Sequence, residues 1–329
     1  MKSMVEAPLV TVIMPVYNTE SYVSDAIGSI LSQKLSRLEL ICVDDGSTDD
    51  SRAICDDFAA CDERVTVLAQ TNSGQGSARN KALELARGRF IYFMDSDDIL
   101  LPEALETVCF EMMEKELDLL FFEAHSFGIA KDAGEYRRKA SYDGIYAGTE
   151  LASLLLRNDE FIVSPCLYVS SAELHRVHRI RFLEEHIKHE DDIFTILTLL
   201  HSKRAACLHR DLYARRYRAG STMTSFDPVS STKGAFRTYS ELLRRREESN
   251  PASPLRSSAA ADFLDRCKHE TVRHFSHCNI SPDRFAEIVG CRDVVEQRAA
   301  SCVIRAISEM GIRFHVERYL RLAKHRLLG

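Results

Sequence analysis

The sequence predicts an α/β fold built on a parallel sheet, followed by a helical C-terminal region. In about the first hundred residues, short apolar runs alternate with segments whose apolar residues recur at helical spacing, which is the pattern of βαβ units. Beyond about residue 230 the apolar spacing is helical, interrupted by a Pro- and Ser-containing stretch at 250–254. A chain of 329 residues is long enough for one large domain with a sizeable extension.

Each predicted strand is a short run rich in β-branched or aromatic residues. The strands are expected at 9–16 (LVTVIMPV), 38–43 (LELICV), 65–69 (VTVLA) and 90–94 (FIYFM). Runs that are apolar throughout are typical of strands covered on both faces, so we expect helices on both sides of the sheet.

The predicted helices lie between these strands. Apolar residues recur at helical spacing from 22 to 31, and Ser47 or Thr48 suits the cap of the helix after the second strand. A helix is expected at 78–86, ended by Gly88, and Pro102 suits the first turn of the helix after the fourth strand.

Polar residues follow the strand ends. Asp95, Ser96 and Asp97 come directly after the fourth strand, so two carboxylates lie two positions apart in the sequence. Ligands of open α/β sheets bind beyond the carboxyl ends of the strands, and hard divalent cations prefer oxygen ligands. The cluster therefore predicts a metal that bridges a diphosphate, whereas the alternative is an acidic helix N-terminus that stabilises the helix dipole.

Four motifs occur in order: PVYN at 15–18, VDDGSTD at 43–49, GSARN at 76–80 and MDSDD at 94–98. Together they resemble the family 2 glycosyltransferases, which have the GT-A fold, a Rossmann-like mixed sheet, and inverting chemistry. The likeness is dense over 8–105 and thinner to about 221. It implies a GT-A domain at 1–225, with a nucleotide-sugar half at 1–120 and an acceptor half at 121–225, followed by a helical extension at 226–329.

The resemblance implies a set of residues that bind the nucleotide sugar. Tyr17 would stack on the base, Asp45 would accept a hydrogen bond from it, and Arg79 would approach the diphosphate or sugar. Asp45 as a capping residue and Arg79 as a surface helix residue are the alternatives. The full set is Pro15, Val16, Tyr17, Asn18, Glu20, Asp45, Arg79, Asp95, Ser96 and Arg218.

The resemblance also implies a divalent cation, Mn²⁺ or Mg²⁺, as cofactor. Asp97 is the expected direct ligand and Asp95 is expected nearer the sugar and ribose, although the sequence does not fix that division. Such a metal neutralises the charge that develops on a leaving nucleoside diphosphate.

Residues 189–194 (HEDDIF) resemble the segment that carries the catalytic base at the start of a helix. We place the base on Asp191 with Glu190 as its neighbour, and Glu190 and Asp192 remain alternatives. Arg218 lies in a segment that resembles Y-R-x-x-S and would cover the diphosphate, unless the segment is simply an exposed basic loop. At 165–168 (PCLY) the family's N-K-L-Y segment has Cys166 in place of Lys, which leaves the acceptor-side contacts open.

Charge is divided unevenly along the chain. Residues 1–125 carry 10 Lys and Arg against 23 Asp and Glu, a net −13, whereas the remainder has a net +7. An acidic N-terminal half excludes a general nucleic-acid binder and suits a cation site. The expected partners are a nucleotide-sugar donor and a glycan or lipid-linked acceptor, and the oligomeric state is left open.

The ten Cys are scattered singly, which predicts reduced thiols and a cytoplasmic location. Residues 1–9 lack the apolar core of a signal peptide, and no run approaches the ~18 apolar residues of a membrane span. Residues 311–329 can form a helix with apolar and basic stripes, which fits either packing onto the domain or peripheral contact with the inner face of an anionic membrane.

Other functions fit the sequence less well. A sugar nucleotidyltransferase usually has a Gly-rich loop with Arg and Lys after the first strand, where this chain has PVYNTE. A non-catalytic nucleotide-sugar-binding subunit would not need both acidic motifs. Zinc is disfavoured because the His pairs at 175–178 and 186–189 lack an H-E-x-x-H pattern.

Overall fold

The computed structural model describes residues 6–129, 136–218, 227–278, 280 and 284–308. The chain divides into two compact units. The first comprises Met1–His186, Glu190–Ser225 and Ala252–Asp262, and the second comprises Ile187–His189, Phe226–Pro251 and Phe263–Gly329.

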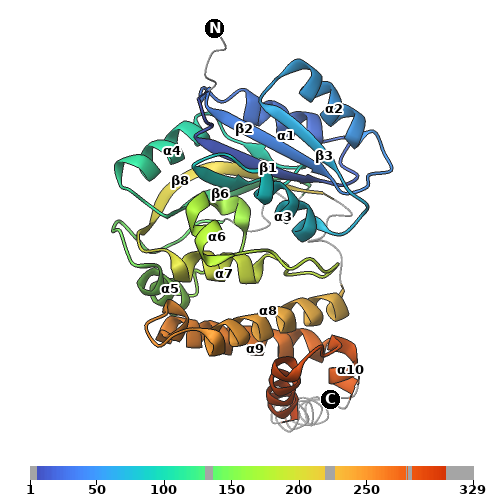
Figure 1. Ribbon diagram of the computed structural model, residues 1–329, viewed down its shortest axis with the longest axis vertical. Coiled ribbons are helices and arrows are strands. Elements are labelled where there is room, and N and C mark those ends of the chain that lie inside the picture. The colour runs from blue at the N-terminus through green and yellow to red at the C-terminus, as the bar shows by residue number, and fades with distance from the viewer. Residues whose placement is uncertain (1–5, 130–135, 219–226, 279, 281–283, 309–329) are drawn as a thin grey trace, which may run out of the picture. The chain divides into compact units, whose positions relative to one another are not determined.

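The first unit is built on one mixed sheet with the strand order β3-β2-β1-β4-β7-β6-β8-β5. In its parallel half, β1 (Val10–Val16) lies between β2 (Leu38–Asp44) and β4 (Phe90–Phe93), and β3 (Val65–Ala69) pairs with β2. Every residue of β1, β2 and β4 is buried, which explains why these strands read as continuous apolar runs. Figure 1 shows β1, β2 and β3 side by side.

The other half of the sheet contains antiparallel pairs. β7 (Tyr168–Ser171) pairs antiparallel with both β4 and β6 (Leu119–Gly128). β8 (Ala205–Tyr217) runs parallel to β6 and pairs antiparallel with β5 (Ile99–Leu100). The predicted α/β class with a mixed sheet is therefore confirmed.

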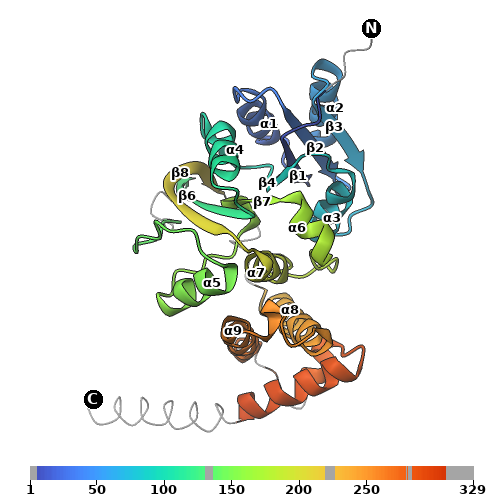
Figure 2. The same cartoon turned by 60° about the vertical axis from the view of Figure 1, so that its left-hand side comes forward.

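Helices cover both faces of the parallel half. α1 (Val23–Leu31) and α2 (Ser51–Cys61) lie on one face, and α3 (Gln75–Leu85) lies on the other (Figure 2). This follows from the right-handed crossovers, because the chain moves from β1 outward to β3 and then returns past β1 to β4. The direction reverses at β1, where an open α/β sheet places its ligand crevice.

In the described part of the first unit, the remaining elements are helical. They are α4 (Ala104–Glu114), α5 (Gly148–Arg157), η1 (Pro165–Leu167), α6 (Ala172–His178), α7 (Asp192–His201) and η2 (Pro254–Arg256). α7 is buried on most of its surface and contacts both α5 and α6.

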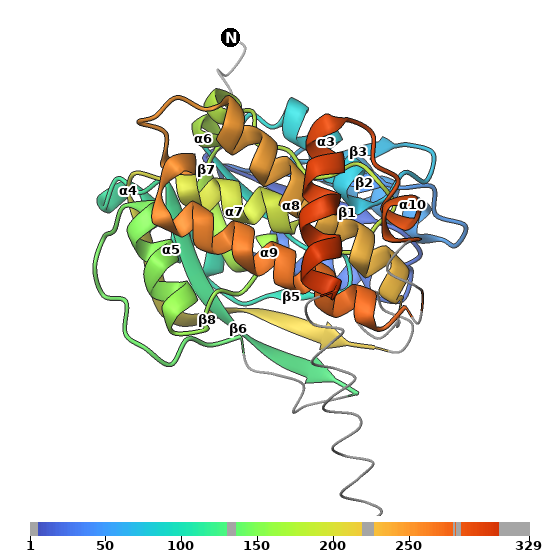
Figure 3. The same ribbon diagram turned by 90° about the horizontal axis from the view of Figure 1, so that it is seen from below.

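The second unit is helical. It contains α8 (Pro228–Glu248), most of α9 (Ser258–Ser276) and α10 (Phe285–Val289). α8 and α9 run side by side in Figures 1 and 3, and α10 packs on α8. Residues 294–308 are also helical. Fully buried Glu296 joins two of these segments because its carboxylate accepts hydrogen bonds from Arg237 of α8 and from Arg292.

In the part of the chain that the structure describes, no helix is both long and apolar enough to cross a membrane. The predicted stripe at 311–329 lies outside the described residues.

Three local predictions were wrong. α2 begins at Ser51 after Asp50, and Ser47 does not cap it because its hydroxyl instead accepts a hydrogen bond from the loop after β1. α3 begins three residues earlier than predicted, at Gln75. Pro102 lies before α4, which begins at Ala104, because the short strand β5 precedes it.

Candidate active site

The loops that follow β1 and β2 are joined by two reciprocal pairs of hydrogen bonds. The Asn18 N–H donates to Ser47 Oγ at 3.1 Å, and Asn18 Oδ1 accepts from the Thr48 N–H at 2.8 Å. Asn18 has a φ of 49°, a left-handed conformation that Asn tolerates better than most residues. Asn18 therefore fixes the path of both loops.

Glu20, two residues after Asn18, makes the same kind of two-way contact with the second loop. Its N–H donates to Asp49 Oδ2 at 3.1 Å, and its Oε2 accepts from the Asp50 N–H at 3.0 Å. We call residues 17–20 and 46–50 together the paired loops.

The other predicted residues of the first motif differ in exposure. Pro15 and Val16 still belong to β1 and lie opposite Val43 and Asp44, so their side chains are buried in the sheet. Tyr17 is 46% exposed. Of these three, Tyr17 alone presents a side chain on which a flat ring could stack.

Asp45 is buried at the end of β2 and accepts three hydrogen bonds from the segment that precedes α3. Its Oδ1 accepts from Gln70 Nε2 at 2.8 Å and from the Ser73 N–H at 2.7 Å, and its Oδ2 accepts from the Gly74 N–H at 2.9 Å. A carboxylate has about four acceptor positions, so one remains for a ligand. Asp45 thus shapes the loop before α3 whether or not it contacts a base.

Arg79 lies at the centre of the site, with its side chain only 3% exposed. Its Nη2 is 2.8 Å from Asp95 Oδ1 and its Nη1 is 2.9 Å from Glu190 Oε1. The guanidinium also lies 5.2 Å from the centroid of the Phe182 ring. Arg79 of α3 therefore joins the acidic cluster after β4 to the segment that precedes α7.

An aromatic cluster lies beneath this ion-paired group. Phe182 stacks on Phe194 of α7, with 3.9 Å between ring centroids, and Phe194 stacks on His175 at 4.8 Å. Phe93 of β4 packs edge-on against both Phe rings. The start of α7 is thus packed directly on the sheet.

Asp95, Ser96 and Asp97 lie at the end of β4, as predicted. Ser96 is buried and its Oγ accepts a hydrogen bond from Thr19 Oγ1 at 3.1 Å, which ties this cluster to the loop after β1. Asp97 Oδ2 is 2.6 Å from Arg218 Nε. Burial and the neighbouring charge of Asp95 raise the pKa of Asp97, although Arg218 opposes this.

Asp98 is buried beside this cluster. Its Oδ2 accepts from the Tyr213 hydroxyl and its Oδ1 from the Arg216 N–H, both at 2.6 Å. Burial, followed by the charges of Asp95 and Asp97, raises the pKa of Asp98 to about 8. Asp98 therefore fastens β8 to the end of β4.

The two predicted catalytic acids occupy different environments. Glu190 is buried and its pKa is raised by burial, with Arg79 acting in the opposite direction. Asp191 is partly exposed and lies at the N-cap of α7, in the position predicted for the base. The structure thus separates a buried, ion-paired Glu190 from a more accessible Asp191.

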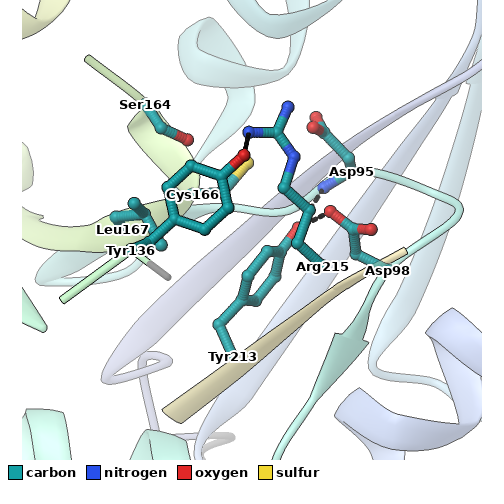
Figure 4. A pocket seen from close by; sticks show the side chains of 8 residues that line it. All are labelled: Asp95, Asp98, Tyr136, Ser164, Cys166, Leu167, Tyr213 and Arg215. Atoms are coloured by element: carbon teal, nitrogen blue, oxygen red, sulfur yellow. Dashed lines mark hydrogen bonds between the residues drawn. The ribbon is translucent and has the colours of Figure 1, made fainter. Parts of the chain in front are cut away.

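A narrow pocket, too tight in this structure to admit a water molecule, lies beside Asp95 (Figure 4). It is lined by Asp95, Asp98, Tyr136, Ser164, Cys166, Leu167, Tyr213 and Arg215. Of these, only Asp95 was among the predicted site residues, although Asp98, Cys166 and Leu167 fall in motifs that the sequence analysis singled out. Tyr213 and Arg215 fall in the Tyr- and Arg-rich stretch that precedes Ser221, which was the available signal for them.

The donor set fits a hard divalent cation only in part. Asp95 and Asp97 supply carboxylate oxygens at one strand end, as Mg²⁺ and Mn²⁺ prefer. Among the described residues, however, no group of three or more His, Cys, Asp or Glu could hold a metal. A cation here would need substrate oxygens to complete its coordination.

A solved structure identifies the fold of this chain. S. aureus TarS (residues 1–349) superposes on this chain with a TM-score of 0.68 at 22% identity, covering 91% of this chain and 82% of that one. The predicted GT-A fold is therefore confirmed.

The family follows from sequence. A family model described as glycosyl transferase family 2 matches residues 11–192, and GlyG of Streptococcus pneumoniae is 32% identical over 67% of this chain and 74% of its own length. The chain belongs to family 2 of the glycosyltransferases and is a transferase enzyme. GlyA of the same organism is 30% identical over 64% of this chain. The matched region covers about a third (31%) of the length of GlyA.

Proposed function

We propose that this enzyme transfers a sugar from a nucleoside diphosphate sugar, with UDP as the expected nucleotide, to a hydroxyl of a growing cell-surface glycan or lipid-linked acceptor, and that the reaction inverts the anomeric carbon. The observation that carries the proposal is the ion-paired group in which Arg79 joins Asp95 to Glu190. In this group, Asp95 on the predicted donor side and Glu190 in the predicted base segment contact the same guanidinium.

The relatives support the donor class. TarS has been solved in complex with UDP-GlcNAc and with UDP. TuaG of Bacillus subtilis, 44% identical over 35% of this chain, is named as a putative teichuronic acid biosynthesis glycosyltransferase. We propose that this chain also uses a UDP-sugar donor and also acts in cell-surface polysaccharide synthesis.

Asp191 is the proposed general base. An acceptor hydroxyl needs a carboxylate to take its proton as the new bond forms. The Glu190 carboxylate is tied to Arg79 and buried, which supports a positioning role for Glu190. Asp191 follows it directly at the N-cap of α7 and is more accessible.

Asp97 and Asp95 are the residues that would hold a divalent cation, and a mannosyltransferase of the same general fold has been solved with Mn²⁺. When bound, the cation would neutralise charge on the leaving diphosphate. Arg218, beside Asp97, would contribute a second positive charge to the diphosphate.

Transfer assays test the proposal. The purified enzyme is incubated with a panel of UDP-sugars and hydroxyl acceptors, with Mn²⁺ or with EDTA, and UDP release and product configuration are measured by NMR. We expect release that EDTA abolishes and an inverted product. A retained anomeric configuration would contradict the proposed mechanism.

Two matched variants test the base. Asp191→Asn should keep UDP binding and lose transfer by about a hundredfold or more. Asp192→Asn changes the adjacent carboxylate in the same way and should retain most activity. If Asp192→Asn is the inactive variant, the base has been assigned to the wrong residue.

For location, we propose a cytoplasmic enzyme that contacts the inner face of the membrane through residues 311–329. The support is the pattern of apolar and basic residues in that segment. The full chain should sediment with anionic vesicles, whereas a chain that lacks 311–329 should stay in the supernatant. Equal recovery of both chains with the vesicles would refute the contact.

A further inference from the structure

Arg215 presents a cation to the pocket beside Asp95. It lies near the end of β8, and its guanidinium points toward Tyr136 (Figure 4). Its Nη1 donates to the Tyr136 hydroxyl at 2.7 Å, and its Cζ lies 5.1 Å from the centroid of that ring. The Tyr136 hydroxyl is itself 3.1 Å from the Tyr217 hydroxyl, so the partners of Arg215 on this side are neutral.

Within the described ranges, no carboxylate lies at ion-pair distance from Arg215. Both acids of the pocket have other partners: Asp95 pairs with Arg79, and Asp98 accepts from Tyr213 and from the Arg216 backbone. A guanidinium has five N–H donors, and Arg215 uses one of them on a protein acceptor.

Among the described residues that line the pocket, Arg215 is the one cation. Cys166, which stands where the resembling N-K-L-Y segment has Lys, lines this pocket and is buried. Ser164 also lines it and adds a hydroxyl. The positive charge of the pocket therefore comes from β8. Burial opposes that charge, but Tyr136, Asp95 and Asp98 outweigh it and raise the pKa of Arg215, so the guanidinium stays charged.

We propose that Arg215 is a specificity-determining residue that binds the carboxylate of an acidic sugar, a hexuronate, carried by either the donor or the acceptor. The planar fork of an Arg matches a carboxylate with two parallel hydrogen bonds. The same sugar has hydroxyls that can donate to Asp95. This inference rests on the proposed function, because it requires a sugar beside Asp95. It also requires the side chains of the narrow pocket to move apart and admit the carboxylate.

The Arg215→Gln variant tests the inference by calorimetry with Mn²⁺. In the donor arm, UDP-glucuronate is compared with UDP-glucose. In the acceptor arm, with UDP present, a disaccharide that ends in glucuronate is compared with one that ends in glucose. We expect the unmodified enzyme to prefer the acid by about tenfold or more in one arm. Arg215→Gln should abolish that preference, and the arm that responds identifies the source of the carboxylate.

Two further variants serve as controls. Arg210→Gln removes an exposed Arg from the same strand and should keep the preference. Arg215→Lys retains the charge without the planar fork and should keep part of it, which guards against a misfolded Gln variant. Absence of UDP binding in the unmodified enzyme would refute the proposed function instead.

Three results would overturn the inference while UDP binding is intact. They are no preference for the acid in either arm, a preference that survives in Arg215→Gln, and a loss of UDP affinity in Arg215→Gln as large as the loss for UDP-glucuronate. The last would mean that Arg215 serves the diphosphate.

Discussion

Arg79 and Glu190 are 111 residues apart in the sequence and form a buried ion pair, with 2.9 Å between Nη1 and Oε1. Both side chains are less than 5% exposed. The same guanidinium pairs with Asp95, donates to Gln75 Oε1 at 3.3 Å and lies over the Phe182 ring, whereas its buried Nε has no hydrogen-bond partner. Through Arg79 of α3, Asp95 at the end of β4 and Glu190 before α7 are held on one guanidinium.

Removing Arg79 should therefore destabilise the first unit. Arg79→Gln leaves Glu190 buried without its cation, and we expect a loss of about 3–5 kcal/mol in the free energy of unfolding. Arg52→Gln breaks an exposed pair with Asp56 and should cost less than about 1 kcal/mol. Urea denaturation of both variants checks this, and equal stabilities would show that the buried pair is not structural.

Gly76 should be intolerant of a side chain for a related reason. A Cβ at this position would lie 2.1 Å from the Leu183 carbonyl oxygen and 3.1 Å from Glu190 Cγ. We expect Gly76→Ala to lower the free energy of unfolding by about 1–3 kcal/mol.

The matched control is Gly28, inside α1, where a Cβ would meet nothing within 4 Å. Gly28→Ala should stabilise the protein by about 0.5–1 kcal/mol, because Ala favours the helix. Thermal melts of the two variants should therefore shift in opposite directions. A shift in the same direction would contradict the close approach at Gly76.

Arg218 should compete with a metal for Asp97. It lies 2.6 Å from the Asp97 carboxylate and both side chains are about a fifth exposed. Arg218→Gln should bind Mn²⁺ alone about fivefold more tightly, which corresponds to about 1 kcal/mol for a partly exposed pair, while its affinity for UDP falls. Electron paramagnetic resonance of free Mn²⁺ measures the first and calorimetry the second. An unchanged affinity for Mn²⁺ alone would mean that the two cations do not share the carboxylate.

His175 should make the first unit sensitive to acid. It is buried, its Nε2 lies 2.7 Å from Ser170 Oγ, and burial lowers its pKa from 6.5 to about 3. Between these values the unfolded chain binds a proton that the folded chain does not, so stability is full above pH 6.5 and falls as the pH decreases.

We expect His175 to account for a loss of about 2 kcal/mol between pH 7 and pH 5. His175→Gln should show a smaller decrease over this range, measured by urea denaturation at each pH. His186→Gln, which changes an exposed histidine, should retain the decrease of the unmodified protein. Parallel pH profiles for the two variants would exclude His175 as the source.

The strands of the parallel half could be predicted because they are buried on both faces, and such strands read as apolar runs in any context. The start of α3 could not, because Gln75 follows a polar loop whose conformation depends on Asp45, about thirty residues earlier. The two-residue strand β5 is too short to carry a periodic signal.

The same limit applies to the site. The acids after β4 and before α7 stand out in the sequence because they are clustered. Their partners, such as Tyr213 for Asp98, are more than a hundred residues away, and only the fold brings them together. Arg79 was predicted from its motif, but its position between Asp95 and Glu190 depends on how α3 packs against two separate segments, the end of β4 and the start of α7.

The paired loops have a consequence for how a ligand would meet this enzyme. Asn18 and Glu20 each donate and accept a hydrogen bond between the two loops, so neither loop can shift without breaking its hydrogen bonds to the other. The conformational entropy of these loops is therefore lost when the chain folds and not when the donor arrives. A nucleotide bound here, as we propose, would meet loops that are already ordered, so little of its binding free energy would be spent on ordering them.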